Sequence, residues 1–559
     1  MAKADYSVKD LVAKIHAGEL RLPEMQRQYV WTGTRVRDLL DSLYRGYPSG
    51  VILAWESDVE VDTRDFAVDV SATSTVRPLL LLDGQQRLTS LSAVMRGEPV
   101  TVRKRKRPIE ILFNLEHPDE LLFATDVLEE SDDDLEAETE SSDLDLQARF
   151  NRMTFVVSSP QLKNSPQWVK VSDIFSKSDS ELLEAAGLTD FKDSRFEKYK
   201  NRIHAVKSIA DYQYRMDILE RTKSYEEVTD IFVRVNSLGA KLRSSDLALA
   251  QITAKWKGSL STFTKFQDGL QEQGFDVELG IILKTMIALI TDQSKFLTVN
   301  SLSLSQLESG WERTKESLTH ALNFIKANVG IDSTALLSSP FLLVTTSYWA
   351  DKDGFSRDAE SAAKFRQWFL IANAKGRYSR GSSETLLDQD LAVMRNGGDA
   401  AGLLQRLIQQ MGRLEFTTED LLGRSSTSGA FKTMFLAFRE AGAQDWSTHL
   451  AISPKHSGKS DSIEYHHIFP RAYLKRSRPE IEKAAINDIS NLAFIGSSTN
   501  KKISDKAPSQ YRLDFSQDDF EAQLIDFAHG FDTAEDFEKF LSARRSEIAK
   551  VLNKFLGLG

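Results

Sequence analysis

Hydrophobic residues recur with two different spacings in the first part of the chain. Apolar positions three and four residues apart predict helices at Val8–His16, Val36–Arg45 and Gln85–Met95. Short apolar runs predict strands at Val51–Trp55, Pro78–Leu82, Ile109–Asn114 and Thr154–Val157. This mixture predicts an α/β domain over residues 1–210.

The spacing becomes helical almost throughout from about residue 180 to 440, where prolines are few. Ile281–Ile290 and Ala362–Ala372 are expected to be core helices. Residues 441–559 combine mixed structure, to about residue 512, with helices beyond it. We therefore expect a multidomain α+β protein with an all-α middle region at 211–440 and a C-terminal domain at 441–559.

The composition restricts the possible metal sites and locations. The 559-residue chain has no cysteine, which excludes disulfides and cysteine-ligated zinc or iron–sulfur sites. Any metal must therefore be held by His, Asp, Glu or Asn. The N-terminus MAKADYSVKDLVAKI lacks the apolar core of a signal peptide, and the apolar runs are too short to span a bilayer. These features predict a cytoplasmic protein with no membrane partner.

Charge is distributed unevenly around a net value of −10. Residues 126–145 contain 11 acidic residues and no basic ones, which predicts a flexible acidic insert at about 120–150. Residues 449–512 contain 11 Lys or Arg against 6 Asp or Glu, so a local basic surface could still bind phosphates. The basic run Arg103–Arg107 fits a solvated loop, with a contact to a phosphate backbone as the alternative.

The C-terminal region contains two adjacent histidines, His466 and His467, followed by Ile-Phe-Pro. Adjacent side chains at a strand end point in opposite directions, so one histidine can face a metal while the other faces a water molecule. Hydrolysis of a phosphodiester needs such a base and a cation. Asn500, downstream on an expected helix, is placed to supply the second metal ligand. The alternative is that both histidines are ordinary surface or core residues.

This region resembles the HNH (ββα-metal) nucleases, in the branch where the final His is replaced by Asn. The resemblance implies that His466 is a metal ligand, His467 the general base and Asn500 the other ligand of Mg²⁺ or another divalent metal. It further implies that Asn491 braces the loop and orients the base. Three lysines, Lys501, Lys502 and Lys506, would contact the DNA backbone.

The N-terminal region carries a polar turn, Asp83-Gly84-Gln85-Gln86-Arg87, directly after an expected buried strand. Free backbone N–H groups at a helix N-terminus bind anions, and Arg87 adds a cationic fork suited to phosphate. Asp83 could hold magnesium or orient a water. The alternative is a structural turn in which Arg87 pairs with a carboxylate. Further polar residues could line the same pocket: Arg27, Arg234 and Asn236.

Together these elements resemble the N-terminal domain of GmrSD-type type IV restriction enzymes, which is similar to the ParB and sulfiredoxin fold. The resemblance implies a nucleotide-binding domain that hydrolyses GTP, ATP, CTP or UTP and regulates cleavage of double-stranded DNA. It also implies modified phage DNA as substrate, either glucosylated or phosphorothioated.

Three functional hypotheses remain open at this stage. The first is a nucleotide-regulated, metal-dependent HNH endonuclease of antiviral defence. The second is a nucleotide-switched DNA-binding protein whose HNH module is inactive. The third is a subunit of a larger defence complex that cleaves only with a partner, and a homo-oligomer is also possible. The complete set His466, His467, Asn491 and Asn500 favours the first hypothesis.

Overall fold

The computed structural model describes residues 2–23, 29, 31–57, 63–64, 78–97, 109–118, 150–159, 162, 165–190, 192–238, 244–352, 355, 359–379, 381–453, 465–527 and 530–558. The chain divides into two compact units, Met1–Leu260 and Ser261–Gly559. The expected borders near residues 210 and 440 stay predictions.

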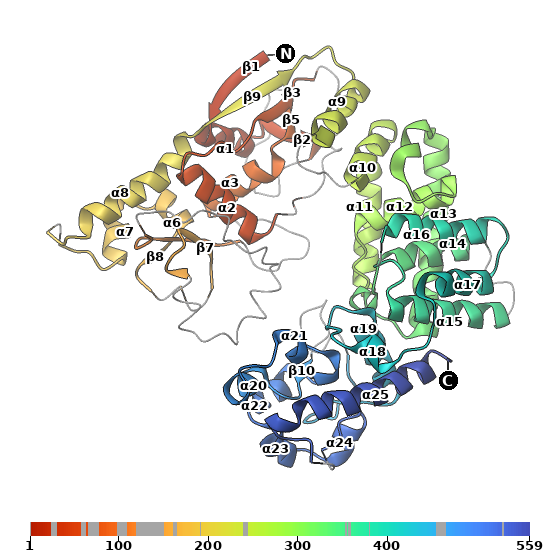
Figure 1. The fold of residues 1–559 in the computed structure, drawn as a ribbon. Coiled ribbons are helices and arrows are strands. Elements are labelled where there is room, and N and C mark those ends of the chain that lie inside the picture. The colour runs from red at the N-terminus through yellow and green to blue at the C-terminus, as the bar shows by residue number, and fades with distance from the viewer. Residues whose placement is uncertain are drawn as a thin grey trace. The chain divides into compact units, whose positions relative to one another are not determined.

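Strands and helices alternate through most of the first unit (Figure 1). Its strands are β1 (Ala2–Ser7), β2 (Leu20–Pro23), β3 (Ile52–Trp55), β4 (Thr63–Arg64), β5 (Leu79–Asp83), β6 (Ile111–Asn114), β7 (Phe155–Val157), β8 (Trp168–Lys170) and β9 (Gln213–Leu219). Its helices are α1 (Val8–His16), α2 (Gly33–Tyr44), α3 (Gln85–Arg96), α6 (Val171–Ser176), α7 (Asp179–Ala185), α8 (Phe196–Lys207), η2 (Ser208–Asp211), α9 (Tyr225–Leu238) and α10 (Ser244–Lys255). The helices and strands expected before residue 160 are thus present, with borders shifted by at most a few residues.

A mixed sheet with the strand order β1-β9-β3-β5-β2-β4 forms the centre of this unit. β3 runs parallel to β9 and β2 parallel to β5, whereas the β1–β9 and β3–β5 pairs are antiparallel. A second, antiparallel sheet has the order β7-β6-β8. The expected α+β class is therefore confirmed.

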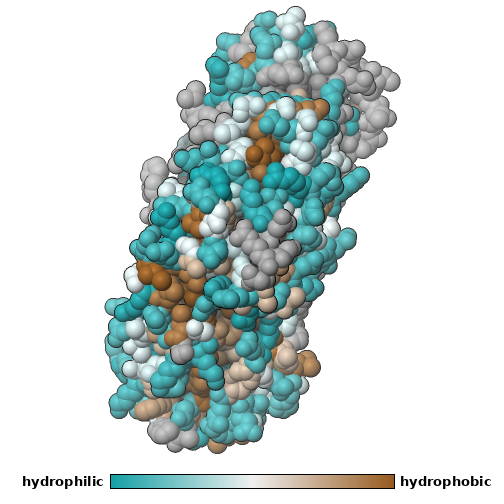
Figure 2. All heavy atoms as spheres, turned by 90° about the vertical axis from the view of Figure 1, so that its right-hand side faces the viewer, coloured by the Kyte–Doolittle hydropathy of each residue, from teal (hydrophilic) through white to brown (hydrophobic). Residues whose placement is uncertain are grey.

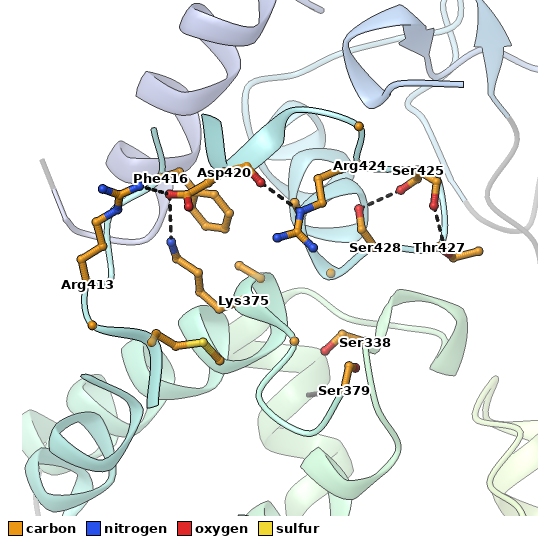
Figure 3. Close-up of a pocket in the computed structure, with 17 residues that line it drawn as sticks. Ser338, Lys375, Ser379, Arg413, Phe416, Asp420, Arg424, Ser425, Thr427 and Ser428 are labelled. Atoms are coloured by element: carbon orange, nitrogen blue, oxygen red, sulfur yellow. Dashed lines mark hydrogen bonds and ion pairs between the residues drawn. The ribbon is translucent and has the colours of Figure 1, made fainter. Parts of the chain in front are cut away.

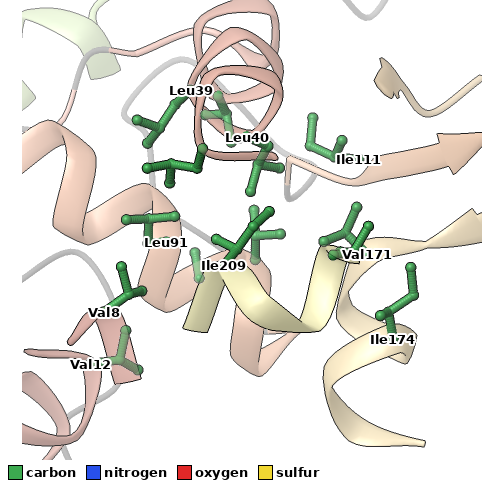
Figure 4. Close-up of a cluster of buried hydrophobic side chains, with 14 of the residues drawn as sticks. Val8, Val12, Leu39, Leu40, Leu91, Ile111, Val171, Ile174 and Ile209 are labelled. Atoms are coloured by element: carbon green, nitrogen blue, oxygen red, sulfur yellow. The ribbon is translucent and has the colours of Figure 1, made fainter. Parts of the chain in front are cut away.

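Both faces of the mixed sheet are covered, which explains why β3 and β5 are almost entirely apolar. Ile52, Ala54 and Leu81 belong to the core formed with α1, α2 and α3. Figure 4 shows side chains of this core converging from these helices and from β6, α6 and η2. The alternate residues of the two strands face a second core, which includes Val228 and Phe232 of α9.

β9 interrupts the stretch for which the sequence predicts only helices. Tyr214 and Met216 are buried between more exposed neighbours, whereas Leu219 breaks the alternation and packs into the core on the other face. An alternation this short, between helical segments, is not distinguishable from helical spacing in the sequence. The strand lies between β1 and β3, and the sheet therefore includes residues from the expected middle region.

The second unit is helical up to α19 and contains a small two-stranded sheet beyond it. Its first part comprises α11 (Ser259–Glu272), α12 (Leu279–Thr291), η3 (Phe296–Ser301), α13 (Leu304–Phe324), η4 (Ile325–Val329), η5 (Thr334–Leu336), α14 (Phe341–Asp351), α15 (Ala359–Lys375), α16 (Ser383–Arg395), α17 (Ala400–Met411), α18 (Thr418–Leu421) and α19 (Gly429–Glu440). Its second part comprises β10 (His466–His467), α20 (Arg471–Ser477), α21 (Lys483–Ile486), η6 (Ile489–Asn491), β11 (Leu492–Ala493), α22 (Ser497–Ile503), α23 (Pro508–Tyr511), η7 (Arg512–Asp514), α24 (Gln517–Glu521), η8 (Ala534–Asp536) and α25 (Phe537–Phe555).

The second unit contains both of the expected core helices. These lie within α12 and α15, and Trp349 stacks on Phe365 within the core.

Hydrophilic residues dominate the face of the chain drawn in Figure 2, with hydrophobic areas between them. None of the helices in the described ranges is long and apolar enough to cross a bilayer.

Candidate functional site

A short hairpin and a helix bring the C-terminal motif together. β10 pairs antiparallel with β11, so that His466 faces Ala493 and His467 faces Leu492. α22 follows β11 directly and carries Asn500. Asp445 fixes the start of α22, because its carboxylate accepts the Gly496 N–H at 2.6 Å and the Thr499 hydroxyl at 2.8 Å.

His466 contacts Asn500, the residue that the sequence predicts as the second metal ligand. The Nδ1 atom of His466 lies 2.7 Å from Oδ1 of Asn500, and the histidine is only 3% exposed. Burial lowers the pKa of His466 to about 4, so the ring is neutral at pH 7. The amide oxygen of Asn500 accepts the Nδ1–H proton, so Nδ1 can ligate a metal only once that proton has moved to Nε2, which has no hydrogen-bond partner among the described residues.

His467 contacts a residue that the sequence reasoning did not single out. Its Nε2 atom lies 3.1 Å from Oδ1 of Asn487, at the end of α21. Burial, reinforced by the positive charge of Arg471, lowers the pKa of His467 to about 4. The ring is therefore neutral at pH 7 and able to accept a proton. Asn487 lies within the quoted Asn487–Ile495 segment, but an asparagine at a turn is too common to be chosen from sequence.

Asn491 is fully buried and ties three backbone groups together. Its Oδ1 accepts the Phe469 N–H at 2.8 Å, and its Nδ2 donates to Phe469 O at 3.2 Å and Ile486 O at 2.9 Å. These contacts link the segment after His467 to the end of α21. They are the contacts that a bracing residue would make.

Arg544 of α25 is a second buried support that the sequence reasoning missed. The guanidinium is 3% exposed and donates to Ser490 O at 2.8 Å, Leu492 O at 2.9 Å and Gln523 O at 2.9 Å. It therefore fixes β11 from behind. No local pattern marks this residue, because its partners lie more than 20 positions away in the chain.

The His466–Asn500 pair fits a divalent cation with few protein ligands. Neighbouring ligands of an octahedral cation lie about 3 Å apart when the bonds are about 2.1 Å long. The described residues contain no cluster of three or more His, Asp or Glu side chains able to hold a metal. A cation at this pair would therefore complete its shell with water and substrate oxygens, as Mg²⁺ usually does.

The three lysines proposed to contact DNA lie on or just after α22, and all are exposed. The ammonium group of Lys502 lies 5.0 Å from the centre of the Phe515 ring. Lys506 is 3.6 Å from the Asp514 carboxylate. These loose surface contacts leave the lysines accessible to a phosphate backbone.

The N-terminal turn has the expected strand–turn–helix form. β5 ends at Asp83, Gly84 adopts a left-handed φ of 101°, and α3 starts at Gln85. Arg87 donates to the carbonyls of Ser49 and Val51 and pairs with Asp83 at 3.0 Å. The arginine is thus engaged by protein acceptors, as the structural alternative requires.

Among the described residues, no contact joins the Asp83–Arg87 turn to the other residues expected in this pocket. Arg27 lies outside them, as do the basic run Arg103–Arg107 and the acidic insert. Arg234 projects from α9 with 75% of its side chain exposed and pairs with Asp230 at 2.9 Å. Asn236 lies on the same helix, but its side chain is outside the described part. Convergence of these residues on a nucleotide therefore stays a prediction.

Comparisons with known proteins agree with the resemblance to GmrSD-type restriction enzymes. Residues 8–253 match the N-terminal domain of GmrSD restriction endonucleases, and residues 418–551 match the C-terminal domain. An uncharacterized protein of Methanocaldococcus jannaschii is 25% identical over 545 residues, which cover 90% of this chain and 85% of the relative. The first match includes the Asp83–Arg87 turn, and the second includes the His466–Asn500 pair. The chain therefore belongs to the GmrSD restriction endonucleases, a family whose activity implies DNA cleavage in restriction-type defence.

Proposed function

We propose that the chain is a nucleotide-regulated, metal-dependent endonuclease that cleaves modified double-stranded phage DNA at the His466–His467 site. The observation that carries this proposal is the 2.7 Å contact between His466 Nδ1 and Asn500 Oδ1, next to a neutral His467. This contact and the histidine beside it place a pair of metal ligands and a general base on one ββα element. Such a combination suits hydrolysis of a phosphodiester.

In this proposal His467 removes the proton from the attacking water. If its Nε2–H donates to Asn487, the lone pair resides on Nδ1, which becomes the proton acceptor. His466 and Asn500 would hold Mg²⁺ or another divalent metal, which stabilises the negative charge on phosphate and leaving oxygen when bound. Asn491 keeps the strand end in place through its three backbone contacts.

The lysines after β11 would position the DNA backbone. Lys501, Lys502 and Lys506 provide three exposed positive charges on and just after α22, and phosphate contacts of this kind set register without reading sequence.

The nucleotide would bind at the Asp83–Arg87 turn, where backbone N–H groups open α3 and Gln85 and Gln86 offer side-chain hydrogen bonds. Arg87 would act as a positioning residue that fixes the Ser49–Val51 loop beside this turn. Hydrolysis of the nucleotide is part of the proposal, and GTP, ATP, CTP and UTP are all candidates.

The test is cleavage of plasmid, glucosylated phage DNA and phosphorothioated DNA with Mg²⁺ or Mn²⁺. We expect metal-dependent cutting that is lost in His467→Ala and kept in His320→Ala, which removes an exposed histidine of α13. Equal cutting by His467→Ala would refute the assignment of the base. Absence of cutting by the wild type would favour the DNA-binding switch or the subunit of a larger complex.

A second arm tests the regulation. Each of the four nucleoside triphosphates is added to wild type and to Arg87→Ala. We expect one or more nucleotides to change the cleavage rate of the wild type and to lose that effect in the variant. Cleavage that no nucleotide alters would remove regulation from the proposal while leaving the nuclease assignment intact.

A further inference from the structure

A cavity of about 680 Å³ lies in the second unit, outside the nuclease site. It is bounded by the C-terminal ends of α15 and α17, the segment around α18 and the N-terminus of α19 (Figure 3). Its volume falls within the range of small-molecule sites, about 300–1,000 Å³. No residue of the proposed nuclease or nucleotide sites lines it.

The charged groups lining this cavity carry a net positive charge. The three cations are Lys375, Arg413 and Arg424, and the acid is Asp420. Asp420 lies 3.6 Å from Lys375 and 3.2 Å from Arg413. Although burial raises its pKa, the hydrogen bond from the Thr417 N–H and the charges of Lys375 and Arg413 bring it below the usual value. Asp420 is therefore ionised at pH 7, and a surplus of two positive charges remains.

Lys375 is held deep in the wall. Its side chain is 7% exposed, and its ammonium lies 3.9 Å from the centre of the Phe416 ring. It also donates to Glu415 O at 2.7 Å. The ends of α15 and α17 add carbonyl oxygens, which oppose an anion, but Lys375 stands at the end of α15 and offsets that helix dipole.

Arg424 leaves donors directed into the cavity. Its Nε donates to Asp420 O at 2.9 Å, whereas Nη1 and Nη2 have no hydrogen-bond partner among the described residues. Figure 3 shows these two nitrogens pointing into the space between Lys375 and Ser428. Unpaired guanidinium donors in a half-buried wall are suited to bidentate recognition of a phosphate.

The N-terminus of α19 contributes a second set of donors. Ser428 caps it by accepting the Phe431 N–H at 3.2 Å, which leaves the N–H groups of Gly429 and Ala430 at the cavity wall. Hydroxyl groups of Ser425, Thr427 and Ser428 lie beside them. The helix terminus and Arg424 therefore offer donors to the cavity, and Lys375 adds a positive charge to its wall.

We propose that this cavity binds a phosphate-bearing ligand of mononucleotide size. The shared chemistry is a phosphate monoester, which a free nucleotide and the 5′-phosphorylated end of a DNA strand can both supply. The inference does not depend on the proposed nuclease mechanism.

The wall that would contact this ligand adjoins the nuclease element. Gly423 N–H donates to the Asp488 carboxylate at 2.8 Å, and Arg424 O accepts the Ile489 N–H at 2.8 Å. Ser426 contacts the hydroxyl of Tyr465, next to His466, at 3.3 Å. An occupant would therefore stabilise residues 423–428 and, through them, the segment that ends at Asn491.

The first test is calorimetric titration of the full chain with deoxyadenosine 5′-monophosphate and with deoxyadenosine, without metal. We expect binding that requires the phosphate and becomes at least tenfold weaker in Arg424→Gln. Arg406→Gln, which removes an exposed arginine of α17 outside the cavity, should bind like the wild type. Equal binding by Arg424→Gln and wild type would overturn the proposal, because the phosphate would then bind elsewhere.

A second experiment distinguishes a free nucleotide from a 5′-phosphorylated DNA end as the ligand that supplies the phosphate. A 5′-phosphorylated oligonucleotide is compared with its 5′-hydroxyl form by the same titration. Binding of the monophosphate alone identifies free nucleotide, and a phosphate-dependent gain with the oligonucleotide identifies a DNA end. Failure of both ligands to show phosphate-dependent binding would refute the site.

Hydrogen exchange provides a readout that is independent of cleavage. The monophosphate should slow exchange in residues 423–431 and 487–491 of the wild type and not in Arg424→Gln. Circular dichroism checks that this variant folds. If it does not, Arg413→Gln, whose side chain is 53% exposed, replaces it with the same expected loss.

Discussion

His467 and Asn487 face each other with the imidazole Nε2 atom 3.1 Å from the amide Oδ1 atom. An amide oxygen only accepts hydrogen bonds, so this contact keeps the proton of the neutral ring on Nε2. The other ring nitrogen, Nδ1, then carries the lone pair. The contact thus selects which nitrogen can act as the base.

Replacing Asn487 should weaken cleavage without abolishing it. We expect Asn487→Ala to slow DNA cleavage by about tenfold, less than the roughly 10²–10⁴-fold loss expected for His467→Ala. The reason is that the base remains but its tautomer and orientation are no longer held. Single-turnover cleavage at saturating metal measures this, with Asn396→Ala at the exposed end of α16 as control. A wild-type rate in Asn487→Ala would show that the contact is not used.

Asn500 should determine the requirement for metal. Because its Oδ1 and His466 Nδ1 form the only proposed protein ligand pair, Asn500→Ala should raise the Mg²⁺ concentration for half-maximal cleavage by about 10–100-fold. Asn500→Asp keeps an oxygen in place and should stay closer to the wild type. Cleavage rates across a magnesium titration provide the measurement. Identical curves for Asn500→Ala and wild type would exclude the residue as a ligand.

Lys501 should contribute to DNA affinity in a salt-dependent manner. If it contacts one phosphate, Lys501→Ala should reduce the slope of log affinity against log salt by about one and weaken binding to all sequences alike. Fluorescence anisotropy over a series of KCl concentrations tests this in the absence of metal. Lys550→Ala, on the exposed side of α25 with 69% of its side chain accessible, is the control and should leave the slope unchanged.

Asp445 should stabilise the second unit in a pH-dependent manner. Burial raises its pKa, but hydrogen bonds from Gly496 N–H, Thr448 and Thr499 bring it below the ordinary value of 3.8. The carboxylate therefore contributes stability that is fully present above pH 3.8 and is lost as the pH falls through the lowered value.

The corresponding variant is Asp445→Asn. We expect it to lower the free energy of unfolding by about 1–3 kcal/mol at pH 7, because donors at the start of α22 lose a charged acceptor. The difference from wild type should shrink in more acidic buffer. Urea denaturation at pH 7 and pH 3 measures both values. A difference that is the same at the two pH values would contradict the role of the ionised carboxylate.

Gly50 should be required for the position of Arg87. Its φ is +95°, and an added Cβ would lie 2.6 Å from Arg87 Nη1. Gly50→Ala should therefore destabilise the first unit by about 2–3 kcal/mol, from backbone strain and from displacement of the arginine. Gly46→Ala shares the positive φ, +70°, but meets no atom within 4 Å, and should cost about 1–2 kcal/mol. Thermal unfolding of both variants compares them, and equal losses would show that the contact with Arg87 adds nothing.

Local patterns predicted most of the elements that carry the two motifs. The helix at Val8–His16 has the expected borders, and the apolar run before Asp83 forms β5. Such patterns arise because a helix or strand buries one or both of its faces, so that buried positions recur at a fixed spacing along the chain. β9 was missed because its alternation is short and its partners β1 and β3 lie more than 150 residues earlier.

By itself, the sequence determined the family, the α+β class and the paired histidines with their downstream asparagines, because these depend on residue type, order and local spacing. Only the tertiary structure decided which partners surround them. It joined His466 to Asn500, gave His467 the partner Asn487 and engaged Arg87 with the Ser49–Val51 loop. Buried supports such as Arg544 and Asp445 also emerged only there, since hydrogen bonds between distant segments arise from packing and leave no periodic trace in the chain.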